Sequence, residues 1–201
     1  MRIAAKPGFP SRDEIASDTA LHYNVSTEAA ETLESETAAV TATFPEADHD
    51  HDRCVADVLA DAERVCRARQ ARLTARRRRV LAIVAESHTA IGAYDIIDRL
   101  AADGKRPAPI TVYRALDFLM DQGLVHRLAS LNAYVACHRA SADHGAQFLI
   151  CRRCGTIGEI TNIKVARAIA GAAADVGFAV AAPLVEVAGL CANCRESRHG
   201  A

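Results

Sequence analysis

Two Cys-x-x-Cys pairs constrain this chain more than any other feature of its sequence. Cys151 and Cys154 form the first pair, Cys191 and Cys194 form the second, and 36 residues lie between the pairs. Two turns of this kind supply four thiolates to one tetrahedral Zn²⁺, while backbone amides of the turns donate hydrogen bonds to the sulfurs. We therefore predict a structural zinc site in the C-terminal part of the chain.

A disulfide or redox role is the alternative for these cysteines. A thioredoxin-like redox site needs only one pair, placed at the start of a helix. Here an apolar run precedes each pair, at residues 147–150 and 185–190, which favours turns at the ends of strands. The chain has seven cysteines, and an odd number with four in metal spacing fits a reducing compartment better than a disulfide framework.

Composition predicts a folded cytoplasmic protein. Half of the 201 residues are apolar, which suffices for a buried core in one or two small domains. A membrane helix needs about 18 consecutive apolar residues, and the sequence has no such run. The N-terminus also lacks a signal-peptide pattern, so we expect a cytoplasmic location and no membrane partner.

Charge is distributed unevenly along the chain. The net charge is −1, but residues 1–53 hold 4 Lys/Arg and 11 Asp/Glu, which leaves about −7 there and +6 on residues 54–201. Eight arginines lie within 16 residues, a density typical of a phosphate-binding surface, with a solvated helix face as the alternative. They are Arg64, Arg67, Arg69, Arg72, Arg76, Arg77, Arg78 and Arg79.

Apolar periodicity predicts an α+β chain with an N-terminal winged helix-turn-helix domain. Helices are expected near residues 55–66, 74–87, 94–102 and 109–122, and two alternating runs at 124–128 and 133–137 predict a hairpin. In a winged helix the last helix enters the major groove of DNA. Thr111 and Arg114 face outward there and are candidate DNA contacts, whereas Tyr113 either contacts DNA or packs against a neighbouring helix.

A small α/β unit follows the winged helix. We expect strands from residue 147 and at 156–160, a helix at 163–176 and a long strand from residue 178 through 187 to the second Cys-x-x-Cys pair. Exposed strand edges and few aromatic residues predict that this unit forms a twofold homodimer. The expected domains are a disordered acidic extension (1–53), a DNA-binding domain (54–138), a hinge (139–146), a dimerisation domain (147–195) and a tail (196–201). We assign the run from His49 to Asp52 to the acidic extension, although its side chains can chelate metals.

A second set of donors consists of His126, Cys137, His144 and Glu159. The predicted hairpin, the loop after it and the second strand of the α/β unit would carry them. Mixed N, S and O donors suit a Zn²⁺ site that must also release its metal. Each residue also has an ordinary alternative, because surface histidines are usually solvated and Glu159 is compatible with an exposed strand.

The sequence resembles the ferric uptake regulator family over about residues 55–195, and within it the zinc-responsive branch. The segments that carry the resemblance are Arg72-Leu-Thr-x-x-Arg77, Ala93-Tyr-Asp-Ile-Ile-Asp98, Thr111-Val-Tyr-Arg-Ala-Leu-Asp-Phe-Leu119, Gly123-Leu-Val-His-Arg127, Tyr134-Val-Ala-Cys-His138, Phe148-Leu-Ile-Cys-Arg-Arg-Cys-Gly155 and Gly189-Leu-Cys-Ala-Asn-Cys194. The resemblance implies a dimeric transcriptional repressor that binds operator DNA, with Arg72, Arg77, Thr111, Tyr113 and Arg114 at the DNA.

The resemblance also implies two Zn²⁺ sites in each monomer. Cys151, Cys154, Cys191 and Cys194 would hold a structural zinc, and His126, Cys137, His144 and Glu159 a sensory zinc at the hinge. Zinc at the hinge would favour the DNA-binding arrangement and repress zinc-uptake genes. The loop before His144 is shorter by about one residue than in comparable family members, so His138 is an alternative ligand.

Two other functions remain to be weighed. An iron- or peroxide-responsive regulator would share the fold, but the thiolate of Cys137 and the absence of a His-rich stretch favour zinc over Fe²⁺. A zinc-dependent hydrolase is less favoured, because the sequence lacks His-Glu-x-x-His and the deaminase pattern with Pro-Cys-x-x-Cys. We therefore do not expect an enzyme.

Overall fold

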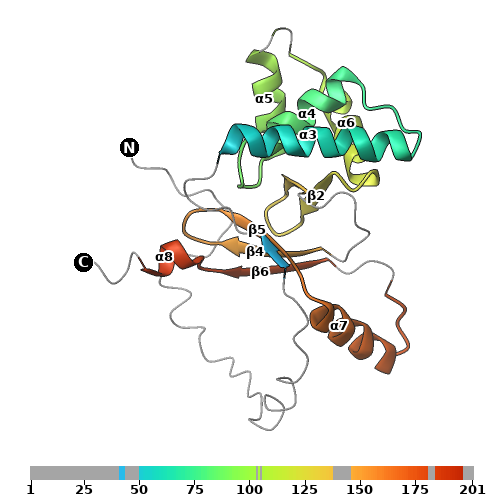
Figure 1. Cartoon of the computed structure of the whole chain (residues 1–201), viewed down its shortest axis with the longest axis vertical. Helices are drawn as coiled ribbons and strands as arrows, with labels where there is room; N and C mark the ends of the chain where they lie inside the picture. The colour runs from blue at the N-terminus through green and yellow to red at the C-terminus, as the bar shows by residue number, and fades with distance from the viewer. Residues whose placement is uncertain are drawn as a thin grey trace. The chain divides into compact units, whose positions relative to one another are not determined.

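The structure is a computed structural model (Figure 1), and four helices and a two-stranded hairpin make up its first part. It describes residues 41–43, 50–102, 104, 106–137, 146–180 and 184–196. The helices are α3 (His51–Ala68), α4 (Ala75–Ala85), α5 (Ala93–Ala102) and α6 (Pro109–Asp121), and the hairpin strands are β2 (Val125–Leu128) and β3 (Ala133–Ala136). This is the predicted winged helix-turn-helix, with α3 added in front.

Local sequence signals set the ends of these helices. The Thr74 hydroxyl accepts a hydrogen bond from the Arg77 N–H at 3.4 Å and caps α4. Pro109 occupies the first turn of α6, where its missing N–H costs nothing. Gly123 ends α6 with a positive φ of 67°, a conformation that glycine adopts without strain.

The second part is a four-stranded sheet with two helices. Its strands are β1 (Thr41–Thr43), β4 (Gln147–Cys151), β5 (Ile157–Thr161) and β6 (Val185–Gly189), in the order β1-β5-β4-β6, and only the β4–β6 pair is parallel. Helix α7 (Ile163–Asp175) connects β5 to β6, and the short α8 (Ala192–Glu196) follows β6. The fold is therefore α+β, as predicted.

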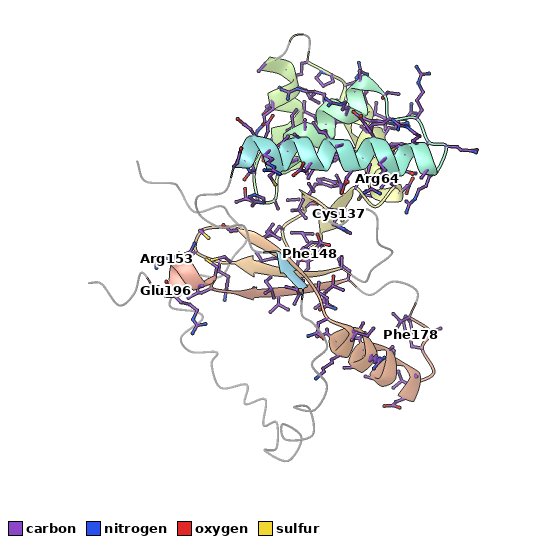
Figure 2. All side chains as sticks on the ribbon, viewed as in Figure 1. Arg64, Cys137, Phe148, Arg153, Phe178 and Glu196 are labelled. Carbon is purple, nitrogen blue, oxygen red and sulfur yellow. The ribbon has the colours of Figure 1, made fainter. Side chains whose placement is uncertain are left out.

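Two apolar clusters hold these elements together. The larger one lies among α3, α4, α5 and α6 and includes the fully buried Leu81, Ile96 and Leu116. The smaller one packs Leu128 and Val135 of the hairpin against Phe148, Ile150 and Ile157 of the sheet. Figure 2 labels Phe148 of this smaller cluster and Cys137, which follows the hairpin and belongs to the larger cluster. The β2–β3 hairpin, which is the wing of the winged helix, is thus packed against the strands that carry the candidate site.

The structure differs from the sequence prediction in two places. Residues 41–43 form a strand against β5 and α3 begins at His51, although disorder was expected through residue 53. Thr41 and Thr43 have high strand propensity, and the Asp50 carboxylate caps α3 by accepting from the Arg53 N–H.

The last strand is also shorter than predicted. It begins at Val185 instead of residue 178. Pro183 just before it has no N–H for a strand ladder, and the chain at residues 176–180 leaves α7 through a turn at Gly177 with φ of 74°. Most of the predicted extension, hinge and tail lies outside the described residues, as do His138 and His144. Within the described part of the chain, no helix has the length and apolarity needed to cross a membrane.

Candidate metal sites and DNA-binding surface

The four paired cysteines converge at one end of the sheet. The Sγ atoms of all four residues lie within 4.8 Å of one another, and Cys154 Sγ is 3.8 Å from Cys191 Sγ. The four residues are Cys151, Cys154, Cys191 and Cys194. The first turn is closed by the Gly155 N–H, which donates to the Cys151 carbonyl at 2.9 Å. Cys151 is the last residue of β4, and Cys191 and Cys194 flank the start of α8.

Backbone N–H groups near these sulfurs favour the thiolate form of Cys151. The Cys191 N–H lies 3.4 Å from Cys151 Sγ. Burial opposes ionisation of Cys151, but N–H groups of Cys154, Cys191 and Arg153 outweigh it and lower its pKa to about 6. Burial and the neighbouring thiols raise the pKa of Cys194 to about 12. A shared cation would allow four such crowded sulfurs to ionise together.

All seven cysteines lie in the described part of the chain, and none of them forms a disulfide. The donor set of four thiols at this separation fits a tetrahedral Zn²⁺ with no open position. The two turns are also linked by the Arg153 guanidinium, which donates to the Cys194 carbonyl at 2.9 Å. Figure 2 labels Arg153 at these turns.

The mixed donor set comes together from three elements. His126 of β2, Cys137 just after β3 and Glu159 of β5 each place a ligand atom within 4.8 Å of the others. Cys137 Sγ is 3.9 Å from Glu159 Oε1, and both residues are buried. The His126 ring lies 5.1 Å from the Phe148 ring, between centroids. The fourth predicted member, His144, and its alternative, His138, lie outside the described residues.

Burial is the property that makes this cluster suitable for a metal. Glu159 is only 4% exposed, and a carboxylate removed from water needs a compensating positive charge or strong hydrogen bonds. Thiol, imidazole and carboxylate donors together match the ligand preferences of Zn²⁺. A cation there would bind the hairpin and the sheet at once.

A third cluster was missed by the sequence analysis. His51, Cys54 and His88 also bring their ligand atoms within 4.8 Å of one another. Burial, and next the Asp57 carboxylate, raise the pKa of the Cys54 thiol. The His-x-x-Cys spacing at residues 51–54 was a usable signal, but the sequence run was assigned to a disordered tail.

The candidate DNA-contacting residues have different surroundings. Arg114 and Arg72 are exposed, whereas Thr111 is half-buried and Tyr113 packs partly against the helical core. The Arg77 guanidinium lies 3.5 Å above the centre of the Phe118 ring and donates to the Arg72 carbonyl at 2.6 Å. Arg77 therefore supports the start of α4 through its own contacts.

The Arg-rich segment is less basic than its composition indicates. Arg64, Arg78 and Arg79 form ion pairs with Asp61, Glu63 and Glu86 at 2.8, 3.1 and 3.2 Å. These pairs are exposed and contribute little stability, but each neutralises one of the eight arginines.

Helices, wing and metal-donor clusters together define a winged-helix protein equipped to bind metals. A profile of the ferric uptake regulator family matches residues 68–188, and the chain belongs to this family. It is 42% identical over 141 residues to the zinc uptake regulation protein of Escherichia coli (strain K12), covering 70% of this chain and 82% of the relative.

Two solved structures are similar over nearly their whole length. A zinc uptake regulator complexed with zinc and DNA has a TM-score of 0.68 and 40% identity, covering 72% of this chain and 97% of that one. The crystal structure of holo XcZur has a TM-score of 0.63 and 42% identity, covering 69% and 96%. Both support the fold assignment across the two parts described above.

Proposed function

We propose that this chain is a zinc-responsive transcriptional repressor that binds operator DNA as a homodimer and represses genes of zinc uptake. The observation that carries the proposal is the cluster of His126, Cys137 and Glu159, which joins the wing to the sheet. The similarity to a zinc uptake regulation protein and to a regulator complexed with zinc and DNA points to the same role.

The sensory role follows from where the three donors sit. His126 and Cys137 belong to the hairpin region of the winged helix, and Glu159 belongs to the sheet. Bound zinc would supply a positive charge that holds these donors together. His126, Cys137 and Glu159 then set the arrangement of the winged helix on the sheet, and only one arrangement fits two half-sites on DNA.

The cysteine site has a different role in this proposal. Cys151, Cys154, Cys191 and Cys194 would hold a structural zinc, because four thiolates leave no position for exchange with solvent or ligand. They fasten the end of β4 to the start of α8. Glu159 lies on β5, the strand that follows the first cysteine turn, so the same turn helps to position the sensory carboxylate.

DNA binding is assigned to α6 and the start of α4. Arg114 on α6 and the exposed Arg72 before α4 would contact DNA, with Thr111 and Tyr113 beside Arg114. Phosphate contacts position such a protein, and base contacts select the operator. Arg77 acts by holding the Arg72 carbonyl and stacking on Phe118.

The exposed apolar surface of the second part supports a homodimer. No residue of α7 is buried in this chain, and β6 is an edge strand of the sheet. Ile163, Val187 and Phe178 are 50%, 49% and 66% exposed, and Phe178 lies just beyond α7 (Figure 2). Apolar area of this extent on a helix and an edge strand calls for a partner surface.

Operator binding with different metals tests the function. Duplex DNA would be selected from a random pool in separate experiments with the protein loaded with Zn²⁺, Fe²⁺ or Mn²⁺, and the affinity of each selected DNA measured with all three metals. We expect tight binding with Zn²⁺ and at least tenfold weaker binding after chelation. Tight binding with Fe²⁺ and none with Zn²⁺ would assign the chain to iron sensing, and no metal-dependent binding would reject the proposal.

A further inference from the structure

A third group of metal-ligating side chains lies outside both sites described above. Cys54 Sγ is 3.9 Å from His88 Nε2, and the rings of His51 and His88 lie 4.9 Å apart between centroids with 64° between their planes. The ligand atoms of all three residues fall within 4.8 Å of one another. Donors of two types thus converge although Cys54 and His88 are 34 residues apart.

The first two donors share one face of a helix. His51 is the first residue of α3 and Cys54 follows three positions later, so their side chains lie above one another on the helix surface. The Asp50 carboxylate accepts from the Arg53 N–H at 3.1 Å and fixes this first turn. The cap therefore fixes the backbone that carries His51 and Cys54.

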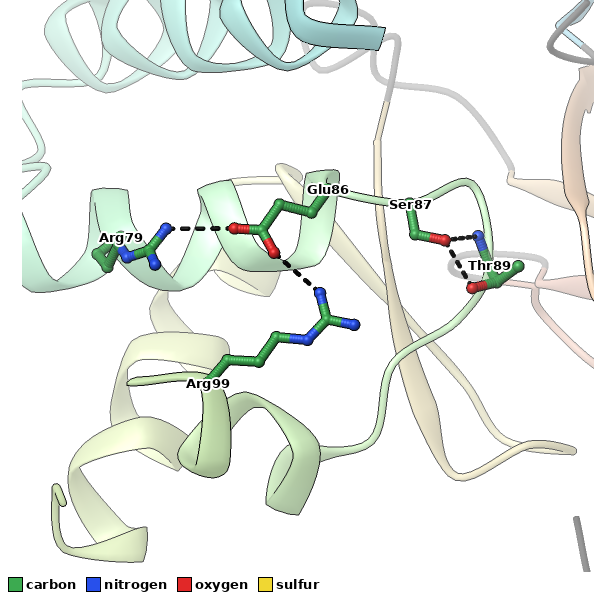
Figure 3. A network of polar contacts seen from close by, with 5 residues as sticks. All are labelled: Arg79, Glu86, Ser87, Thr89 and Arg99. Atoms are coloured by element: carbon green, nitrogen blue, oxygen red, sulfur yellow. Dashed lines mark hydrogen bonds and ion pairs between the residues drawn. The ribbon is translucent and has the colours of Figure 1, made fainter. Parts of the chain in front are cut away.

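The third donor, His88, lies between Ser87 and Thr89, and Figure 3 shows the polar contacts of these two neighbours and of Glu86. Ser87 Oγ accepts from the Thr89 N–H at 3.1 Å and lies 2.7 Å from Thr89 Oγ1. Glu86, the residue before Ser87, pairs with two arginines at 3.2 and 2.9 Å. His88 lies inside this turn (residues 86–89), so its backbone is already ordered and binding would cost mainly the conformational entropy of its side chain.

The same turn contacts the sheet. The Ile157 N–H donates to the His88 carbonyl at 2.8 Å, and the backbones of Thr89 and Thr156 form an isolated antiparallel β-bridge. A metal ion bound by His51 and Cys54 of α3 and by His88 would therefore connect the first helix to the turn that contacts β5.

The spacing of the donors is close to that of a tetrahedral zinc site. Zn–S bonds of about 2.3 Å and Zn–N bonds of about 2.0–2.1 Å imply an S···N separation of about 3.5 Å. The 3.9 Å between Cys54 and His88 needs only a few tenths of an ångström of closure. A thiolate with two imidazoles suits a borderline cation such as Zn²⁺ or Co²⁺, and Mg²⁺ and Ca²⁺ prefer oxygen donors.

A surface pocket beside Cys54 has more acidic than basic side chains. It is lined by Asp50, Asp57 and Asp61, of which Asp61 pairs with Arg64 at 2.8 Å, and by Arg53, Val58 and Cys137. The negative charge of these carboxylates favours a cation, and a carboxylate or a water molecule can complete four-fold coordination. Packing of two imidazole rings against a thiol, without any metal, is the competing explanation.

We propose that His51, Cys54 and His88 form a third metal site, for Zn²⁺ or a cation of the same class, which fastens the start of α3 to the turn that contacts the sheet. This site shares no donor with the cysteine cluster or with the His126–Cys137–Glu159 cluster, although Cys54 and Cys137 line the same pocket. It would bind metal whether or not the chain acts as a repressor.

The number of zinc ions bound by the full chain tests the site. Equilibrium dialysis at fixed free Zn²⁺ would compare the unaltered chain with the double variant Cys54→Ser/His88→Gln. We expect the double variant to bind one zinc fewer per monomer. Cys66→Ala is the matched control, because Cys66 is a buried cysteine of the same helix that lies outside the cluster, and it should keep the full number. Equal zinc binding by the double variant and the unaltered chain would overturn the proposal.

A second comparison separates this site from the sensory cluster. The double substitution would be repeated in a chain that already carries His126→Ala and Cys137→Ser. The loss of one zinc should persist in that background, and its disappearance would overturn the proposal by assigning the metal to the sensory cluster.

The single variant His51→Gln covers the case in which the double variant does not fold. His51 is a half-buried residue in the first turn of α3, so its replacement should leave the circular dichroism spectrum unchanged. We expect at least the roughly 10–100-fold loss of affinity that removal of an outer partner of a metal ligand causes. Hydrogen exchange at residues 51–54 and 86–89 should also slow on addition of Zn²⁺ in the unaltered chain and not in this variant. Unchanged affinity and exchange would overturn the proposal.

Discussion

The thiols of this chain differ because their immediate surroundings differ. Backbone N–H groups overcome the effect of burial at Cys151 and lower its pKa to about 6. At Cys66, burial raises the pKa, and the nearby Arg77 and Arg69 offset it only in part. Cys66 packs in the helical core as a small apolar residue. Donor N–H groups in the first turn therefore distinguish Cys151 from Cys66, whereas the pKa of Cys194 in the same cluster is raised by burial and by the neighbouring thiols.

Replacement of Cys154 by serine should destabilise the C-terminal part. A structural zinc of this type contributes about 10–16 kcal/mol of apparent binding free energy in small zinc domains, and loss of one thiolate forfeits much of it. We expect one zinc fewer per monomer and a clearly lower Tm, checked by metal analysis and thermal unfolding. The control Cys66→Ala should keep its zinc. An unchanged Tm and zinc content for Cys154→Ser would contradict the structural role.

Replacement of Cys137 by serine should instead abolish the zinc response. A serine side chain has nearly the same shape as the buried cysteine but is a poor zinc ligand, so the fold and the cysteine site should persist. We expect operator binding at least about tenfold weaker at a fixed free Zn²⁺ concentration, measured by fluorescence anisotropy. His126→Ala should behave in the same way. Full zinc-dependent binding by both variants would reject the sensory assignment.

At the scale of elements, local chemistry was predictable from the sequence and strand extent was not. Thr74, Pro109 and Gly123 set helix ends through their own side chains or backbone, and their signals can be recognised without the fold. The start of β6 depends on pairing with β4, from residue 147 onward, and the nearby Pro183 does not by itself identify Val185 as the first residue of the strand. The strand at Thr41–Thr43 is equally dependent on its partner β5.

Helix α6 offers a test at this scale, because its N-cap is Ala108, which makes no side-chain cap. The backbone there is extended, with φ −64° and ψ 138°, and accepts serine or aspartate without strain. Either residue should cap a free N–H of the first turn and stabilise the protein by about 0.5–1 kcal/mol. Denaturant unfolding of the zinc-loaded chain would measure this gain.

The same two substitutions should differ in DNA binding. Ala108→Ser adds no charge, whereas Ala108→Asp places a carboxylate beside Thr111, at the end of α6 proposed to face phosphates. We expect Ala108→Ser to bind the operator like the unaltered chain and Ala108→Asp to bind it at least about fivefold more weakly. Equal affinities for the two variants would argue that this end of α6 is away from the DNA.

At the scale of the whole molecule, the metal sites show what sequence spacing can and cannot predict. The spacing of the two Cys-x-x-Cys pairs is sufficient to group the four cysteines into one predicted site. His126, Cys137 and Glu159 were grouped by their donor chemistry and their place in the predicted hairpin and strand, and the family resemblance then implied a sensory site. His88 approaches Cys54 through the packing of α4 on α3, and no sequence signal linked the two residues. Convergence of residues from different elements is a tertiary property, and at Cys54 and His88 only the folded structure revealed it.

Assembly of two chains is the last property that belongs to this scale. If α7 and β6 cover the same surfaces of a second copy, Val187→Arg should place an unpaired charge in the interface, because Val187 is 49% exposed on β6. We expect a monomer by sedimentation that keeps the cysteine zinc. It should bind operator DNA much more weakly, because contact with two half-sites at once would be lost. Tyr94→Arg adds the same charge to a 65% exposed residue of α5 and should remain a dimer. If Val187→Arg sediments as a dimer at the same concentration, the interface lies elsewhere.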